Sequence, residues 1–279
     1  MPLVLALLSA VVYGTADFLG GLAARRTAAL AATVVAQGVG FAVVLLALPL
    51  FPGGPLTSAT ALWGGAAGIT GGAGVALLYY GFAVGRVSVV APVTAVCSIT
   101  IPVIVALGLG ERPGALALIG IALAIASVAL VSRHEDPAAA SAGRDRSVAI
   151  ALVSGVAIGV FLVCLARAGT ASGLWPLVVA RATSTVALAA AARVAGIPLA
   201  IPRSVLPVAI ACGALYMLAN ALYLVATRDG PLGLVATLAS LYPASTVLLA
   251  RTVLRERLRP VQSLGLACAA VAVVLITSR

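Results

Sequence analysis

The chain is a succession of long apolar runs separated by short polar breaks. The runs predict ten membrane-spanning helices, at residues 3–24, 28–50, 59–83, 87–109, 113–132, 148–168, 174–195, 204–226, 231–253 and 260–278. A helix that crosses a bilayer needs ~20 predominantly apolar residues, and Pro or Gly at the breaks ends one helix or starts the next. The strands of a membrane β-barrel would be ~10 residues long with alternating polarity, so helices explain the pattern better.

Composition supports this reading and narrows the partners. Hydrophobic residues make up 63% of the chain and charged residues 9%, whereas soluble domains have about 45–50% apolar and about 25% charged residues. We therefore expect a multi-pass protein of the cell (plasma) membrane, with the lipid bilayer as a partner. The net charge of +10 comes from arginines scattered between apolar runs, without a basic stripe of interleaved aromatic residues. This distribution predicts a membrane topology and no nucleic-acid partner.

A repeat organises the chain. The segment Val90–Arg133 recurs from Val235, with residue n pairing with residue n+145. Identities at this offset include Glu111/Glu256, Arg112/Arg257, Gly120/Gly265, Ser9/Ser154 and Gly14/Gly159. The pattern predicts a five-helix unit at 1–134, a polar linker at 135–146 and a second unit at 147–279. Because five is odd, the units must lie oppositely in the membrane, which gives an all-α fold of ten helices in two inverted repeats.

The arginines also predict an orientation. Loops 1–2, 3–4, 5–6, 7–8 and 9–10 share one side and carry eleven arginines, against four on the other side. The positive-inside rule places the arginine-rich side in the cytoplasm and both termini outside.

Two turns carry a resemblance to a known family. Gly110-Glu111-Arg112 and Arg255-Glu256-Arg257 each precede an apolar helix that contains a glycine, and the first span contains Tyr13-Gly14. Together with the duplicated ten-span layout, they resemble the EamA-type members of the drug/metabolite transporter superfamily, over nearly the whole chain. The resemblance implies a secondary transporter, an exporter or exchanger of a small metabolite, amino acid or drug-like solute. Members of this family usually have cytoplasmic termini, the opposite of the arginine count.

Inverted-repeat transporters bind their solute near the bilayer midplane, between the repeats. By analogy, spans 1, 3, 4, 6, 8 and 9 are expected to line a central cavity that opens to each side in turn. A gradient of protons or of substrate would drive this alternating access. A membrane scaffold or subunit that transports nothing is the alternative function.

Asp17 is the first candidate functional residue, about two-thirds along the first span. A charge in hydrocarbon costs roughly 2.5–3.5 kcal/mol, so this carboxyl should face the bundle interior and have a use there. One interpretation is a proton-coupling or cation-binding group. The other is a structural pair with an arginine such as Arg181.

Arg181 lies seven residues into span 7, too deep to flank the membrane. Its planar fork could bind a carboxylate or phosphate of the substrate. Alternatively it pairs with Asp17, or its long side chain reaches out to one membrane face.

Span 8 carries a polar stripe. Tyr216, Asn220, Tyr223 and Thr227 follow at helical spacing, which places them on one face. The stripe predicts either the lining of a cavity or a hydrogen bond from Asn220 to a neighbouring helix.

Prolines within spans suggest a further part of the site. Pro102 in span 4 and Pro243 in span 9 each lack an N–H, which frees a backbone carbonyl. That carbonyl and neighbouring side chains such as Ser98 and Tyr242 could line a midplane site; a kink that serves packing is the alternative.

The sequence contains no signature of an enzyme. It has no HExxH, no GxSxG with a histidine in reach, no P-loop and no CxxC pair, and its single histidine lies in the linker. We expect no catalysis, no metal, no cofactor and no nucleotide. The residues do not specify the substrate, the direction of transport, the coupling ion or the oligomeric state.

Overall fold

The computed structural model describes residues 2–51, 53–108, 115–132, 142–168, 172–229, 242–256 and 260–277. In these ranges all regular structure is helical: α1 (Pro2–Ala24), α2 (Ala29–Ala47), the short 3-10 helix η1 (Leu48–Leu50), α3 (Ser58–Val84), α4 (Val87–Gly108), α5 (Ala115–Ser132), α6 (Ala142–Arg167), α7 (Trp175–Val194), α8 (Leu206–Asp229), α10 (Tyr242–Val253) and α11 (Pro260–Thr277).

The helices follow the predicted apolar runs, and α10 is the described part of the run at 231–253. Six segments of the described chain are long and apolar enough to cross a membrane: Pro2–Ala24, Ala29–Leu50, Ser58–Val84, Arg146–Arg167, Trp175–Val194 and Leu206–Tyr223. Shorter apolar stretches lie in α4 and α11. Large apolar side chains cover the outside of the bundle, with Leu46, Leu62 and Val186 79%, 71% and 70% exposed. Such a surface is suited to lipid rather than to water.

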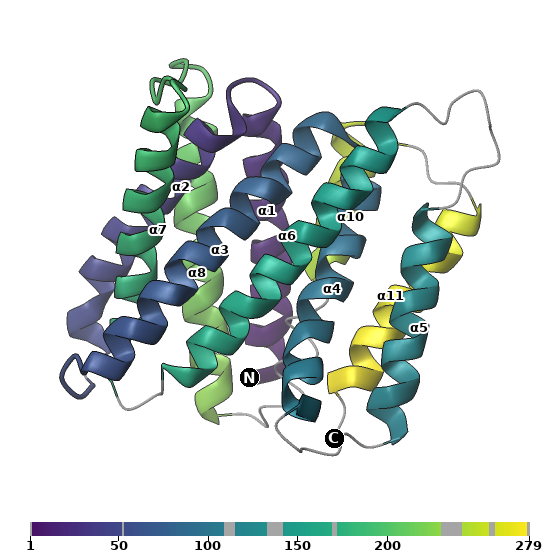
Figure 1. Ribbon diagram of the computed structural model, residues 1–279, viewed down its shortest axis with the longest axis horizontal. Coiled ribbons are helices and arrows are strands. Elements are labelled where there is room, and N and C mark those ends of the chain that lie inside the picture. Colours follow the sequence, from purple (N-terminus) through teal and green to yellow (C-terminus); the bar gives the residue numbers. More distant parts are fainter. Residues whose placement is uncertain are drawn as a thin grey trace.

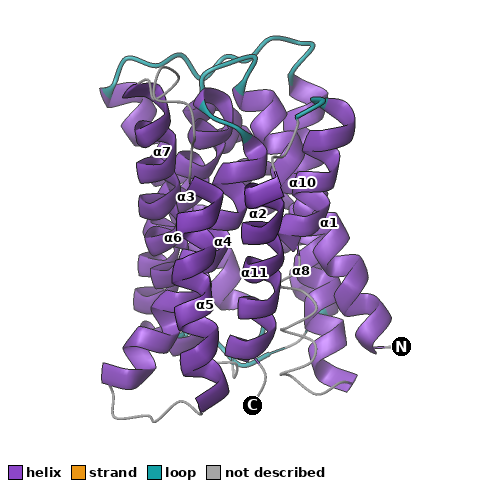
Figure 2. Cartoon of the chain, turned by 90° about the vertical axis from the view of Figure 1, so that its right-hand side faces the viewer, coloured by secondary structure: helices purple, strands orange, loops and turns teal. Residues whose placement is uncertain are grey.

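The helices stand side by side in one bundle, with connections at its two ends (Figures 1 and 2). α3 and α6 pack along each other, as do α1 and α8, and each of these pairs is flanked by α7 or α2. α5 and α11 pack mainly on each other at one edge and join the bundle through α4 (Figure 1).

The sequence repeat reappears as a repeat of contacts. The hydroxyl of Ser9 donates to the carbonyl of Ala219 at 2.9 Å, and the hydroxyl of Ser154 donates to the carbonyl of Gly74 at 2.8 Å. Both donors and both acceptors are separated by the offset of 145 residues. The same hydrogen bond therefore joins α1 to α8 and α6 to α3, and the two halves exchange partners symmetrically.

The two halves are inverted. α1 runs parallel to α3, because Gly20 lies against Tyr79 and Gly21 against Phe82. α3 runs antiparallel to α6, as three close approaches show: Gly71 to Phe161, Gly74 to Ile158 and Gly81 to Ile150. α1 and α6 therefore point in opposite directions, as their positions in Figure 1 also indicate.

Glycines at equivalent positions allow the helices of each half to approach closely. A Cβ on Gly14 would lie 2.3 Å from the carbonyl oxygen of Tyr242 in α10, and a Cβ on Gly159 would lie 2.5 Å from Ile101 in α4. Along α3, Gly64, Gly68 and Gly72 face α7, and a Cβ on Gly68 would lie 2.4 Å from the carbonyl oxygen of Ala180. A side chain at any of these positions would force neighbouring backbones apart.

The loops that carry most of the described arginines lie at one end of the bundle, which we call the arginine-rich end (Arg25, Arg86, Arg203 and Arg255). Arg25 contacts both the α3–α4 connection and the segment after α10, and Val205 packs on Ala23 and Ala32. The sequence predicted that these loops share a side; which side of the membrane they face remains a prediction.

Candidate functional site

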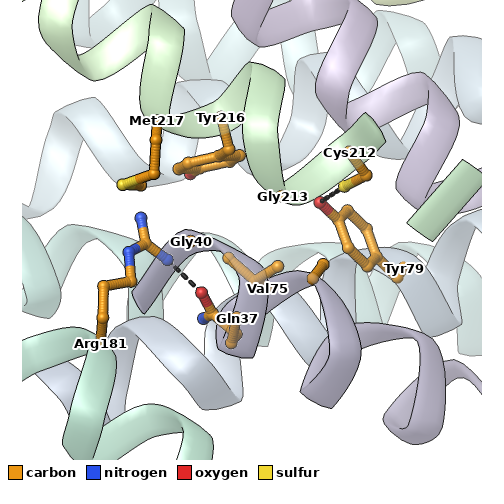
Figure 3. Close-up of a pocket in the computed structure, with 10 residues that line it drawn as sticks. Gln37, Gly40, Val75, Tyr79, Arg181, Cys212, Gly213, Tyr216 and Met217 are labelled. Carbon is orange, nitrogen blue, oxygen red and sulfur yellow. Dashed lines mark hydrogen bonds between the residues drawn. The ribbon is translucent and has the colours of Figure 1, made fainter. Parts of the chain in front are cut away.

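A buried arginine lies at the centre of the bundle, where α2, α7 and α8 meet. Arg181 is 8% exposed, and its Nη1 donates a hydrogen bond to the Oε1 of Gln37 (Figure 3). Its guanidinium lies over the ring of Tyr216, 4.9 Å from the ring centroid. This cation–π contact and the amide are neutral partners, so the contacts leave the positive charge uncompensated.

Two adjoining pockets surround this arginine and share Gln37, Val75, Arg181 and Tyr216. The first lies between α2, α3, α7 and α8. The second extends along the glycine-lined face of α3 toward α6 and α7. Both are narrow in this conformation, with about 10 Å³ and about 30 Å³ of free space. Of the residues that line the two pockets, Arg181 alone carries a charge.

The lining differs from the expected one. Spans 1, 4 and 9 were expected to line the cavity, but α1, α4 and α10 contribute no residue to these two pockets, whereas α2 and α7 do. The reason is the position of the α2–α7 pair, which packs between α3 and α8 at the place where the halves meet.

Asp17 is buried close to this site but is not part of the pocket lining. Its side chain is 5% exposed, and its Oδ1 has no hydrogen-bond partner among the described residues. It forms no ion pair with Arg181, so the structural pair that was one of the two interpretations of Asp17 is not formed in this structure. Tyr13 and Tyr216 interact electrostatically with both the carboxyl and the guanidinium.

A cluster of tyrosines connects α1 with α8 and α10. The ring of Tyr13 meets Tyr216 edge-on, with centroids 5.3 Å apart, and lies 6.4 Å from Tyr242. The Tyr13 hydroxyl donates to the Oδ1 of Asn220 at 2.8 Å, and the amide of Asn220 donates to the Tyr216 carbonyl at 2.7 Å. Asn220 therefore makes the interhelical hydrogen bond that was the alternative to cavity lining.

The predicted polar stripe of span 8 is only partly assembled into the site. Tyr216 lines both pockets, whereas Tyr223 packs with Leu5, Ala6 and Ala226 near the start of α1. The side chain of Thr227 lies outside the described residues.

The prolines and their neighbours lie outside the two pockets. Ser98 is buried, donates to the carbonyl of Ala95 at 2.9 Å and interacts with Tyr242. Pro102 lies inside α4, as expected for a helix interruption. Pro243 is the second residue of α10, and the residues before Tyr242, where a helix interruption would be seen, lie outside the described ones.

Gln37 is the pocket residue that the sequence interpretation missed. It is 4% exposed and accepts a hydrogen bond from the Arg181 guanidinium. The available signal was an amide in the middle of the apolar run 28–50, the same signal that singled out Asn220.

The polar side chains near the site are not repeated in the other half of the chain. At the offset of 145 residues, Tyr13 corresponds to Ile158, Asp17 to Leu162, Asn220 to Val75 and Tyr216 to Gly71. The counterparts are apolar side chains or glycine, and the equivalent helices still pack against each other. Helix packing therefore does not require the polar side chains, and a function other than packing has to account for them.

A second polar cluster closes the arginine-rich end. Arg25 donates to the carbonyl oxygens of Phe82 at 2.8 Å and Gly85 at 3.1 Å, and its Nη2 lies 3.3 Å from the Oε1 of Glu256. The carboxylate of Glu256 also accepts hydrogen bonds from the backbone N–H groups of Val87 at 3.2 Å and Ser88 at 3.0 Å. Glu256 of the second half thus caps α4 of the first half. Glu111, its counterpart in the repeat, lies outside the described residues.

Nothing in the described residues suggests metal chemistry. They contain no group of three or more His, Cys, Asp or Glu side chains that could hold an ion. The cysteines within them are free, and Cys212 interacts with the hydroxyl of Tyr79 at 3.2 Å (Figure 3).

Comparison with known proteins gives a family and a similar fold. A family model described as the EamA-like transporter family matches residues 1–133 and 146–278. A solved structure described as "Crystal structure of protein" superimposes with a TM-score of 0.56 at 18% identity, over 96% of both chains, which supports the fold alone. No curated protein sequence matches the chain.

Proposed function

Because the chain belongs to the EamA-like transporter family, a family of membrane transporters and not of enzymes, we propose that it exports or exchanges a small solute by alternating access. The solute is a metabolite, an amino acid or a drug-like molecule. It binds in the pockets around Arg181, and the membrane is the cell membrane. Nothing in this mechanism requires a cofactor or a nucleotide.

One observation carries the proposal: a buried charge lies in a pocket between two halves that otherwise pack symmetrically with apolar side chains. A charged group inside a bilayer protein is costly and marks a substrate or ion pathway in most cases. A membrane scaffold would gain nothing from Arg181, because the symmetry-equivalent position, Ala36, packs without a charge. The polar pocket therefore favours transport over the scaffold alternative.

Inversion of the halves supplies the conformational step. In inverted-repeat transporters, one half rocks against the other around a fixed midplane site. Here, Arg25 and Glu256 join the halves at the arginine-rich end. Opening of that end requires this contact to break, while the pocket around Arg181 stays between the halves.

Asp17 is the candidate for proton coupling. It is a buried carboxyl whose Oδ1 has no hydrogen-bond partner among the described residues, and Tyr13 on the same helix packs edge-on against Tyr216, which lines the pocket. A proton gained or lost there changes the charge behind the binding site without occupying the site itself.

A flux experiment tests the proposal. Purified protein is reconstituted into vesicles that are loaded with a cell metabolite extract, and the solutes that leave are identified by mass spectrometry. We expect at least one small solute to leave faster than from vesicles without protein, and its release to saturate. Release that is the same with and without protein for every solute would favour the scaffold alternative.

A further inference from the structure

We infer that the transported solute is a small monoanion, a carboxylate on a compact apolar body, and that Arg181 binds the carboxylate. That the anion is transported depends on the proposed function. Binding of such an anion can be tested separately.

The positive charge of Arg181 has no partner of opposite sign among its contacts. Arg181 is buried, and its contacts are an amide oxygen and the face and hydroxyl of a tyrosine, all neutral. The nearest buried carboxyl, that of Asp17, forms no ion pair with it. A buried charge is stable only with a partner of opposite sign, because the interior solvates it poorly. An anionic ligand supplies that partner.

The guanidinium of Arg181 has a geometry that suits a carboxylate. A guanidinium offers five N–H donors in a planar fork that matches the two oxygens of a carboxylate. One nitrogen is directed at Gln37, and the remainder of the fork points into the pocket between Gly40, Tyr216 and Met217 (Figure 3). The absence of a side chain at Gly40 leaves the approach to the guanidinium open, with the Cδ of Arg181 3.8 Å from where a Cβ would lie.

The single positive charge in the pocket lining limits the ligand to one negative charge. Arg181 is the single charged residue in the lining of both pockets, and it lies in the middle of α7 rather than at a helix N-terminus. A phosphate dianion would bring an excess negative charge into a buried site without a second cation or a helix dipole to compensate it. A carboxylate neutralises the arginine one to one.

The lining of the pockets also limits the rest of the solute molecule. Beyond Arg181, most of the lining is apolar or glycine, with Val75, Ile158, Phe161, Leu177 and Met217 as its larger apolar members. Gln37 and Ser184 are its polar side chains besides the tyrosines. A sugar or polyol would leave many hydroxyls without hydrogen-bond partners there, whereas an apolar body would not.

Binding of matched probes to the purified full-length protein tests the inference. Thermal unfolding in detergent is measured with benzoate and butyrate, with their uncharged amides benzamide and butyramide, and with the dianion phenyl phosphate. We expect at least one carboxylate to raise the unfolding midpoint in a saturable way, and the amides and phenyl phosphate to have no such effect. Stabilisation by an amide equal to that by its carboxylate, stabilisation by phenyl phosphate, or no stabilisation by either carboxylate would overturn the inference.

Variants of Arg181 test whether the carboxylate binds there. Arg181→Gln should weaken carboxylate binding roughly 10- to 100-fold, the loss typical of a charge-assisted hydrogen bond. Arg193→Gln is the matched control, because it removes the same charge from the exposed last turn of the same helix and should leave binding unchanged. If Arg181→Gln does not fold, Arg181→Lys keeps the charge without the planar fork and should still bind more weakly than wild type. Wild-type affinity in the variant that folds would refute a role for Arg181.

The vesicle experiment separates this inference from the proposed function. If a neutral solute crosses and no carboxylate binds, the protein is a transporter and the inferred ligand class is wrong. If a carboxylate binds at Arg181 and no solute crosses, the ligand class stands as a binding property and the transport proposal fails.

Discussion

The ion pair between Arg25 and Glu256 gives a test of how the arginine-rich end opens. We consider the substitution Glu256→Gln, which keeps the size of the side chain and one carbonyl oxygen but removes the charge. In the structure, the Glu256 carboxylate accepts from Arg25 and from two backbone N–H groups at the start of α4. Its side chain is 10% exposed and that of Arg25 is 28% exposed, so solvent screens this pair only partly.

The magnitude follows from the contacts that are lost. A hydrogen bond to a charged group contributes about 1.5–3 kcal/mol, and a negative charge near a helix N-terminus adds about 0.3–1 kcal/mol. The amide of glutamine still accepts one of the hydrogen bonds, and exposed pairs contribute about 0–1 kcal/mol, which sets the lower limit. We expect the closed end to lose about 1–3 kcal/mol, which corresponds to a roughly 5- to 150-fold shift toward the open conformation.

Cys212 provides the assay, because it lines the first pocket and is fully buried in this conformation. In a variant with alanine at the other cysteines, the rate of alkylation by N-ethylmaleimide reports how often the pocket becomes accessible. Glu256→Gln should raise this rate by the factor given above. Arg25→Gln should also raise it, and the increase in the double variant should be smaller than the product of the two single increases, since both substitutions break the shared ion pair.

Arg26→Gln is the control, because Arg26 is exposed at the same end of the bundle. It should leave the alkylation rate within twofold of wild type. An unchanged rate in Glu256→Gln, or additive increases in the double variant, would show that the pair does not hold this end closed.

Other substitutions test the proton coupling and the packing of the helices. Asp17→Asn should abolish transport driven by an imposed pH gradient while the unfolding midpoint stays near wild type; proton coupling that persists in this variant would exclude the carboxyl. Gly14→Ala should destabilise the protein by about 1–3 kcal/mol, because its Cβ would lie 2.1 Å from the nearest atom of α10. Gly38→Ala, with its nearest atom 3.8 Å away, should be neutral or stabilising in the same unfolding measurement. Ser9→Ala and Ser154→Ala should each cost about 0.5–1.5 kcal/mol, and a large difference between them would argue against equivalent halves.

The helices and their duplication could be predicted from the sequence, because both depend on patterns along the chain. Apolar runs of the length of a bilayer predict spans directly, and the offset of 145 residues that pairs Ser9 with Ser154 reappears as paired hydrogen bonds. The arrangement within the site depends on how each helix is rotated about its own axis. Spacing along one helix defines a face, as for Tyr216 and Tyr223, but does not tell which neighbour that face meets.

The same limit explains the errors at the site. Opposite charge suggested, as one of two interpretations, that Asp17 pairs with Arg181, yet it is Gln37 of α2 that accepts a hydrogen bond from the guanidinium. The Arg25–Glu256 pair joins residues that are 231 positions apart, which no local pattern reveals. The repeat located Glu256 at a turn, and only the packing of α10 beside α4 shows which helix its carboxylate caps.

The departures from symmetry have a consequence for the transport cycle. In an inverted repeat, exchanging the conformations of the two halves turns a structure closed at one end into a structure closed at the other. If the halves were identical, these two structures would have the same free energy. Arg25 breaks this equality, because the residue at its offset of 145 is Thr170, which cannot form the corresponding ion pair. The conformation closed at the arginine-rich end therefore has an advantage of about 1–3 kcal/mol, the same free energy that Glu256→Gln should remove. A solute that binds at Arg181 and favours the opposite conformation acts against this advantage, so the apparent affinity of the pocket should depend on whether the Arg25–Glu256 pair is intact.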